Sequence, residues 1–144
     1  MISPTLSPVL DRDPSVDVAV NAARLVRTIR HQIGMPAGMR VLALIDETGP
    51  VGISQLAFID ECSQPTMSAA VASLVAQGYV IKTQSATDAR SNVVSITEYG
   101  YEALAEFRES MARIIRDRLA MSGHGDEDVA TTASVLQSIL DAES

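Results

Sequence analysis

The residues best suited to chemistry form a short polar segment, Thr87-Asp88-Ala89-Arg90-Ser91-Asn92. An arginine at a loop tip presents a planar, permanently charged guanidinium, which can bind phosphate or enter the narrow, negative minor groove of A·T-rich DNA. Asp88 precedes Arg90 by two residues, so we expect its carboxylate to pair with the guanidinium and fix its direction. The alternative is an exposed loop ion pair of little energetic value, and this segment taken alone favours it.

A second group of candidates lies in the segment 63–77. Ser63 is a good N-cap for a helix, and Pro65 is tolerated in its first turn. Glutamine can address an adenine edge, and Ser or Thr can bond a base or a phosphate. The alternative is that these side chains only cap and solvate the helix. The segment has no Lys or Arg, the side chains that most often contact guanine.

Together the two segments and the strand between them supply the candidate DNA contacts. Lys82 suits a phosphate contact, although alone it is an ordinary edge-strand lysine. The full set is Ser63, Gln64, Thr66, Ser68, Ser73, Lys82, Asp88, Arg90, Ser91 and Asn92.

Three cationic or titratable side chains recur at steps of three and four: Arg24, Arg27 and His31. They share one helical face and could receive an anionic ligand; a solvated or salt-bridged face is the favoured alternative. Met39 joins this candidate ligand set. We expect the response to a carboxylate ligand to be abolished when both Arg24 and Arg27 are replaced by alanine.

Cys62 lies just before the expected helix at 64–77 and is the chain's single cysteine. A thiolate at a helix N-terminus can have a lowered pKa, so redox sensing is one hypothesis. A packed turn cysteine beside the acidic Asp60 and Glu61 is the favoured one. One cysteine excludes a disulfide within the chain and is typical of a reducing compartment.

Composition limits the remaining function classes. The chain has 144 residues, a hydrophobic fraction of 47% and a net charge of −7, which excludes a disordered acidic tail and disfavours electrostatic DNA binding. The charges are unevenly distributed, because residues 63–96 sum to +1 and the other residues to −8. There is no G-x-S-x-G, P-loop or pair of histidines at metal-ligand spacing, so we expect no enzyme, cofactor or metal site.

The sequence does not suggest a membrane protein. Its longest uncharged stretch, 62–81, contains Pro65, Gly78 and several polar residues that a bilayer could not accommodate. The N-terminal segment lacks the pattern of a secretory signal. We therefore expect a cytoplasmic protein with no membrane partner.

Periodicity predicts a mainly α chain with a small β-hairpin (α+β). The expected helices begin at Pro14, capped by Asp13, and at Pro36, then cover Ile53–Ile59 and Gln64–Gln77. The last of these should bury Met67, Val71, Leu74 and Val75. The β-branched runs Tyr79–Thr83 and Asn92–Thr97 should form a hairpin. Thr97 should cap a long helix, and Gly123-His124-Gly125, where His124 has no evident partner, should separate it from a last helix.

This order is that of a winged helix-turn-helix head with additional helices. The outer helices are too long and too apolar for the small head to cover, so we expect them to be buried against a second copy. The expected organisation is an arm and first dimerisation helix at 1–35, a winged helix-turn-helix at 36–97 and C-terminal dimerisation helices at 98–144, integrated in one domain.

Several motifs resemble the MarR family of winged-helix transcriptional regulators. They are ISQLA (53–57), QPTMS (64–68), LVAQGYV (74–80), DARS (88–91) and ITEYG (96–100). The resemblance implies an obligate homodimer joined by its first and last helices, with the 64–77 helix in the major groove and the wing arginine in the minor groove. It also implies a repressor that a small, often aromatic or phenolic, ligand releases from DNA.

The chain departs from the family where many members carry basic residues. Ala69 and Ser73 are small and neutral here, and Lys82 stands where arginine is common, which retains the charge but loses the planar fork. We therefore expect weak phosphate anchoring and strong reliance on Arg90.

The leading hypothesis is a homodimeric, ligand-responsive regulator that binds a pseudo-palindromic double-stranded operator. Two alternatives remain: a winged-helix module that binds a protein partner without specific DNA binding, and a redox sensor that acts through Cys62.

Overall fold

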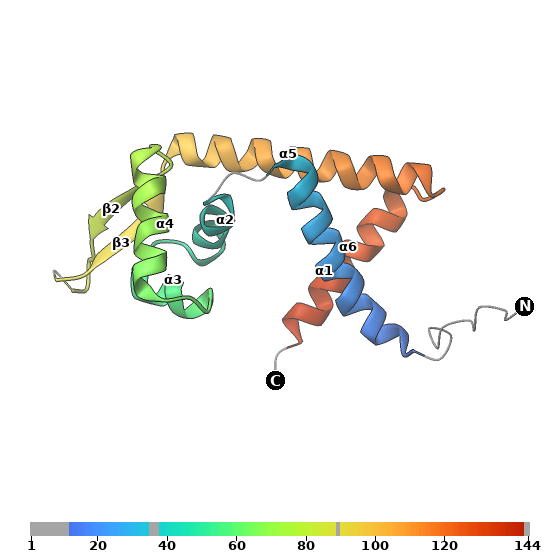
Figure 1. Cartoon of the computed structure of the whole chain (residues 1–144), viewed down its shortest axis with the longest axis horizontal. Coiled ribbons are helices and arrows are strands. Elements are labelled where there is room, and N and C mark those ends of the chain that lie inside the picture. The colour runs from blue at the N-terminus through green and yellow to red at the C-terminus, as the bar shows by residue number, and fades with distance from the viewer. Residues whose placement is uncertain (1–11, 35–37, 89, 143–144) are drawn as a thin grey trace, which may run out of the picture. The chain divides into compact units, whose positions relative to one another are not determined.

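The computed structural model describes residues 12–34, 38–88 and 90–142. It divides into two compact units, Met1–Met35 and Pro36–Ser144. The elements are drawn in Figure 1. The second unit is mainly helical with one small antiparallel sheet, as the sequence predicted.

The first unit contains one helix, α1 (Pro14–Ile33). Asp13 caps it by accepting a hydrogen bond from the Ser15 backbone N–H at 2.9 Å, and this bond lowers the pKa of the Asp13 carboxyl. Gly34 ends the helix in the left-handed conformation with φ of 64°. The start of the helix follows the predicted cap, Asp13.

The second unit begins with a small winged head. It contains α2 (Met39–Thr48), β1 (Val51–Gly52), α3 (Ile53–Ile59), α4 (Gln64–Ala76), β2 (Val80–Gln84) and β3 (Asn92–Ile96). The strands are antiparallel in the order β1-β3-β2, with Val51 opposite Val94 and Lys82 also opposite Val94 across the other edge. The hairpin was predicted, but β1 was not, because two residues are too few to show an alternating pattern.

A single apolar core holds the head together. The helix α2 packs against α4, β3 and α5, and α3 packs against α4. The largest fully buried side chains come from every helix of the head and from both long strands: Leu42, Ile45, Leu56, Met67, Val71, Leu74, Val80, Val94 and Leu104. The predicted burial of α4 is correct for three residues. It is wrong for Val75, which is 39% exposed because it lies at the edge of the buried face.

The long helix α5 (Glu98–Met121) starts inside the head. The Thr97 hydroxyl accepts from the Gly100 backbone N–H at 3.0 Å and donates to the Gly78 carbonyl at 2.7 Å, which ties the start of α5 to the end of α4. Gly100 is required there, because a Cβ atom would lie 2.1 Å from the Tyr79 carbonyl oxygen.

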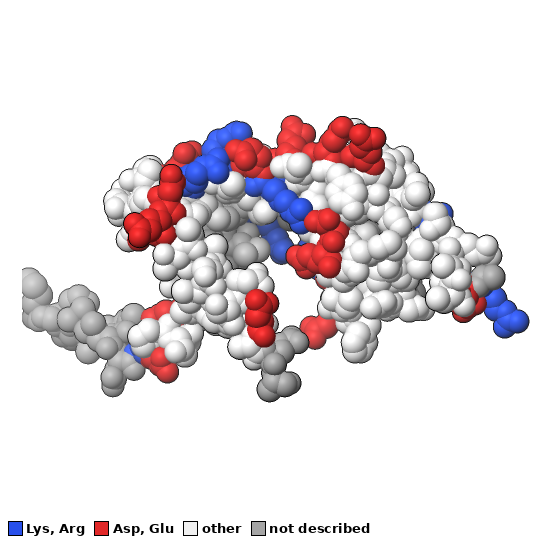
Figure 2. All heavy atoms as spheres, turned by 180° about the vertical axis from the view of Figure 1, so that it is seen from behind, with Lys and Arg blue, Asp and Glu red and all other residues white. Residues whose placement is uncertain are grey.

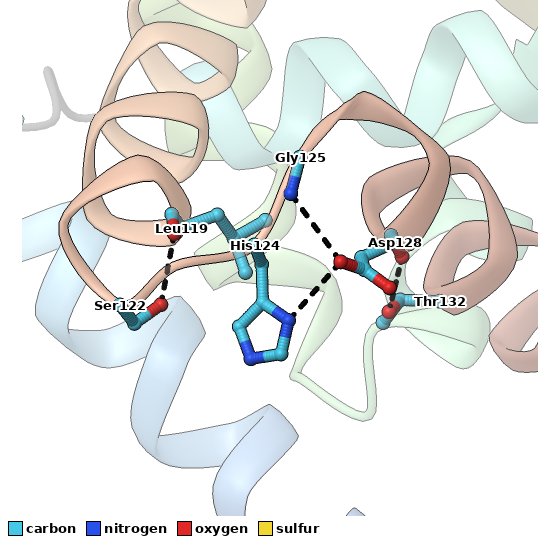
Figure 3. Close-up of polar contacts among 6 residues, drawn as sticks. All are labelled: Leu119, Ser122, His124, Gly125, Asp128 and Thr132. Carbon is cyan, nitrogen blue, oxygen red and sulfur yellow. Dashed lines mark hydrogen bonds and ion pairs between the residues drawn. The ribbon is translucent and has the colours of Figure 1, made fainter.

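The last helix, α6 (Asp126–Asp141), follows a tight turn, shown in Figure 3. Asp128 accepts from His124 Nδ1 at 3.1 Å and from the Gly125 backbone N–H at 3.3 Å. These bonds, the histidine bond foremost, lower the pKa of the Asp128 carboxyl. The expectation that His124 has no partner was wrong, because the start of α6 brings a carboxylate back over the turn.

The second predicted helix starts in part outside the described residues. Pro36 belongs to the segment 35–37, of which the structure describes nothing, and the described helix begins at Met39 after Gly38, whose φ is 95°. Among the described residues, no helix is long and apolar enough to cross a membrane.

Candidate nucleic-acid interface

The N-terminus of α4 is fixed by its own cap. Ser63 Oγ accepts from the Thr66 backbone N–H at 3.2 Å, and the Ser63 and Thr66 hydroxyls lie 2.8 Å apart. Because the two hydroxyls share one hydrogen bond, only one of them keeps a hydrogen to donate elsewhere. Both side chains are exposed. They could contact a phosphate at the helix N-terminus, where the backbone N–H groups also favour an anion.

Gln64 is held toward the preceding helix. Its Nε2 donates to Ser54 Oγ of α3, so the amide links the two helices of the helix-turn-helix. The turn between them is fixed by two further interactions: Cys62 N–H donates to the Ala57 carbonyl at 3.0 Å, and Arg40 of α2 pairs with Asp60. Glu61 adopts a positive φ of 53° in this turn.

The C-terminal end of α4 carries a second local pair. Gln77 Nε2 donates to the Ser73 carbonyl at 3.2 Å and to Ser73 Oγ at 3.0 Å. Ser68 is half-buried on the flank of the helix, and no described residue bonds its hydroxyl. The predicted base-reading side chains are therefore on one exposed helix, but several are occupied by bonds within the chain.

The wing tip is organised by Asp88 in a way the sequence did not predict. The carboxylate accepts from the Arg90 backbone N–H at 3.0 Å and from the Ser91 hydroxyl at 3.1 Å. No ion pair joins it to the Arg90 guanidinium, and that guanidinium pairs with no other carboxylate in the described part of the chain. Asp88 thus shapes the loop backbone, an ordinary role for aspartate in turns, and leaves the exposed Arg90 side chain available.

The other wing candidates lie on the two strands. Lys82 is exposed on β2, and Asn92 is exposed at the start of β3 opposite Gln84. The Ser91 carbonyl accepts from the Ser85 backbone N–H at 2.8 Å, which closes the base of the loop. The wing therefore presents Lys82 and Arg90 from one hairpin.

Figure 2 shows the charge distribution on one face of the molecule. Acidic side chains gather along α5 and at its junction with α6, whereas the surface of the winged head is mostly uncharged. This agrees with the sum of +1 over residues 63–96. The negative charge of the chain is thus concentrated outside the candidate interface.

The candidate ligand-binding residues and the single cysteine lie outside the wing and the exposed face of α4. Arg24, Arg27 and His31 are exposed on α1, and none of them forms an ion pair with a described residue. Met39 is 5% exposed and belongs to the core of the head. Cys62 is half-buried, and its thiol is free. Within the described ranges, no group of His, Cys, Asp and Glu side chains could hold a metal ion.

The helix α4 also has an apolar exposed face, which the sequence analysis did not single out. The outward face of α4 carries Ala69 and Ala72, both exposed. The signal was present, because these alanines lie opposite Met67, Val71 and Leu74 on a helical wheel.

The element order and the exposed α4 beside a basic wing define a winged helix-turn-helix protein. Solved structures share this fold: a transcriptional regulator of Thermotoga maritima has a TM-score of 0.67 at 21% identity, over 90% of this chain and 94% of that one. A MarR family protein of Bacillus stearothermophilus has a TM-score of 0.69 at 17% identity, over 88% and 90%.

A protein-family model and a relative of similar length match the sequence. The MarR family model matches residues 35–92. An uncharacterized HTH-type transcriptional regulator of Mycobacterium bovis is 26% identical over 141 residues, which is 94% of this chain and 99% of that protein. Over the winged head the chain resembles MarR-family transcriptional regulators.

Proposed function

We propose that the protein is a homodimeric repressor that binds a pseudo-palindromic operator and is released by a small aromatic or phenolic ligand. The observation that carries the dimer is the exposure of α6. No residue of α6 is buried, although the helix carries Val135, Leu136, Ile139 and Leu140 on one side. Apolar side chains at this density are covered in a stable protein.

The helix α1 supports the same proposal when considered by itself. Val16, Val20 and Val26 are exposed, together with Val18 and Leu25. Two apolar helices, one at each end of the chain, supply the surface for a second copy. A two-fold dimer presents two α4 helices and two wings, which suits two half-sites separated by about 34 Å.

At each half-site we assign different roles to the two segments. Ser63 and Thr66 contact phosphate at the N-terminus of α4, with Gln64, Ser68 and Ser73 along the same helix. Lys82 contacts the backbone, and Arg90 enters the minor groove, with Ser91 and Asn92 beside it. Asp88 shapes the loop that presents Arg90, as its bonds to the Arg90 N–H and the Ser91 hydroxyl suggest.

DNA binding is tested by an affinity series over salt concentration, with duplexes from the region upstream of the protein's own gene. We expect specific binding with a steep salt slope, and we expect Arg90→Ala to weaken it and to lower the slope by about two, since the dimer loses one arginine at each half-site. Arg113→Ala is the matched control, because Arg113 is exposed on α5, outside the head. Equal losses for both variants, or no specific binding by wild type at low salt, would contradict the proposal.

Release by ligand is proposed to depend on Arg24 and Arg27, with His31 on the same helix; Met39 is excluded from this set because it is buried in the core of the head. Benzoate and phenol serve as probes of a carboxylate and a neutral aromatic ligand. We expect benzoate to dissociate the wild-type complex, and the variant with Arg24→Ala and Arg27→Ala to remain bound. An unchanged benzoate response in that variant would remove the arginines from the ligand site.

A further inference from the structure

The hydrogen-bonding side chains of α4 are largely engaged within the chain. Ser63 and Thr66 bond each other, and Gln64 bonds Ser54. Ser73 and Gln77 form the third pair. A helix that reads base edges mainly by hydrogen bonds needs free donors and acceptors at its centre, and α4 has no charged side chain to add.

The outward face of α4 is instead small and apolar. Pro65, Ala69, Ala72 and Ala76 recur at steps of four, three and four, and all four are exposed. They form one row on the side of the helix away from the buried Met67, Val71 and Leu74. A helix that is apolar on both sides is usually buried, so the exposed row of α4 should be covered in the working complex.

We propose that this row reads thymine 5-methyl groups in the major groove, so that the operator half-site is specified by thymines rather than by guanines. The inference rests on the proposed DNA-binding function and names the base groups that the same helix contacts. The thymine methyl is the one apolar group that a base pair displays in the major groove, and alanine and the threonine methyl are its usual partners.

The surroundings of the row favour duplex DNA as its occupant over a protein. Lys82 and Arg90 lie on the adjacent wing, both exposed, and residues 63–96 carry a net positive charge in a chain of −7. The side chains of Ala69 and Ala72 are also short, so the helix backbone can approach the floor of the groove closely. A protein-binding row would be expected to carry larger apolar side chains that bury more area.

The contacts assigned to Ala69 and Ala72 are tested with thymine analogues. A duplex is first recovered from a random pool by wild-type protein, and each half-site thymine is then replaced by uracil, which lacks only the methyl group. We expect affinity to fall about fourfold for each contacted methyl. Replacing half-site guanines by 7-deazaguanine, which removes a major-groove acceptor, should change affinity less than twofold.

A double-mutant cycle distinguishes direct contact from an effect of uracil on DNA shape. Ala69→Ser replaces the methyl surface of the protein by a hydroxyl and retains the helix. In this variant the difference between thymine and uracil at one position should largely disappear. Ala105→Ser, an exposed position on α5, is the matched control and should retain the full difference.

The outcomes separate the inference from the function on which it rests. A recovered duplex whose affinity is insensitive to uracil, or sensitive to 7-deazaguanine alone, would overturn the inference and leave the DNA-binding function intact. If wild type recovers no specific duplex and the row is instead covered by a protein, both are overturned.

Discussion

The helices α4 and α6 are both rich in apolar residues, yet they differ in how many of these residues are buried. The helix α4 buries Met67, Val71 and Leu74 in the head and exposes only small side chains on its opposite face. The helix α6 buries nothing and exposes large ones, with Ile139 at 56% and Leu140 at 69%.

The two helices therefore differ in what covers their large apolar side chains. Those of α4 are covered within the single chain, whereas those of α6 are not. The head has its own core, built from elements that pack against one another. The apolar area of α6 contributes to stability only when a second surface covers it. We therefore expect the head to depend mainly on internal packing, and α6 on protein concentration.

The largest expected effect comes from a charge on the exposed apolar side of α6. In the proposed dimer, Ile139→Asp introduces a carboxylate in each copy, and burying an unpaired charge costs several kcal/mol. We expect a monomer at micromolar concentration by sedimentation velocity, with the head still folded by near-native methyl NMR shifts.

Ser138→Asp is the matched control, because Ser138 is exposed on another side of the same helix. It should leave the dimer intact. If the dimer persists unchanged in Ile139→Asp, α6 is not the interface. A second copy would then not explain why α6 exposes large apolar side chains and α4 does not.

The next effect concerns the closest packing within the head. Gly100→Ala places a Cβ atom against the Tyr79 carbonyl and 2.8 Å from Ile96 Cγ2, so β3 and α5 must separate. We expect the free energy of unfolding to fall by about 3 kcal/mol, measured by urea denaturation at fixed protein concentration.

Gly125→Ala is the control for this change. Nothing lies within 4 Å of a Cβ atom at Gly125, the N-cap of α6. Its cost should therefore be limited to the loss of a good N-cap residue, about 1 kcal/mol or less. Comparable losses at Gly100 and Gly125 would show that the head is not the more tightly packed region.

The helices of the head and of the chain ends could be predicted in part from the sequence. The capping residues Asp13, Ser63 and Thr97 and the helical periodicity located the helices, because caps and apolar spacing act locally. The two-residue strand β1 was missed, since it exists only by pairing with β3. Burial at the margin of a helix, as at Val75, depends on the exact rotation of the helix in the core.

The hydrogen-bond partners of the candidate DNA contacts were harder to predict than the helices that carry them. Arg90, Gln64 and Thr66 are exposed. The partners of Asp88, Gln64 and Gln77 could not be read from spacing, because each side chain has several acceptors or donors within reach, and only the folded backbone selects among them.

A smaller effect is expected from the N-terminal caps of α4 and α6. The helix α4 is capped by the Ser63 hydroxyl, whereas the N-cap of α6 is Gly125, which has no side chain to accept a bond. Ser63→Ala should therefore destabilise the head by about 1 kcal/mol in urea denaturation. Ser134→Ala, at an exposed position inside α6, serves as control and should change stability by less than about 0.5 kcal/mol. Equal effects would indicate that the α4 cap contributes nothing beyond helix propensity.

The smallest effect is the pH dependence of the α5–α6 turn. The hydrogen bonds from His124 and from the Gly125 N–H lower the pKa of Asp128, so the folded turn favours the ionised carboxylate. The stabilisation is fully present above the ordinary carboxyl pKa and is lost as pH falls through the lowered value. His124→Ala should raise the Asp128 titration midpoint toward its ordinary value, measured from the side-chain carboxyl ¹³C shift. It should also speed exchange of the Gly125 amide, while the amides of α4 keep their protection. A midpoint that does not move would show that the backbone N–H alone holds the carboxylate and that His124 does not stabilise the turn.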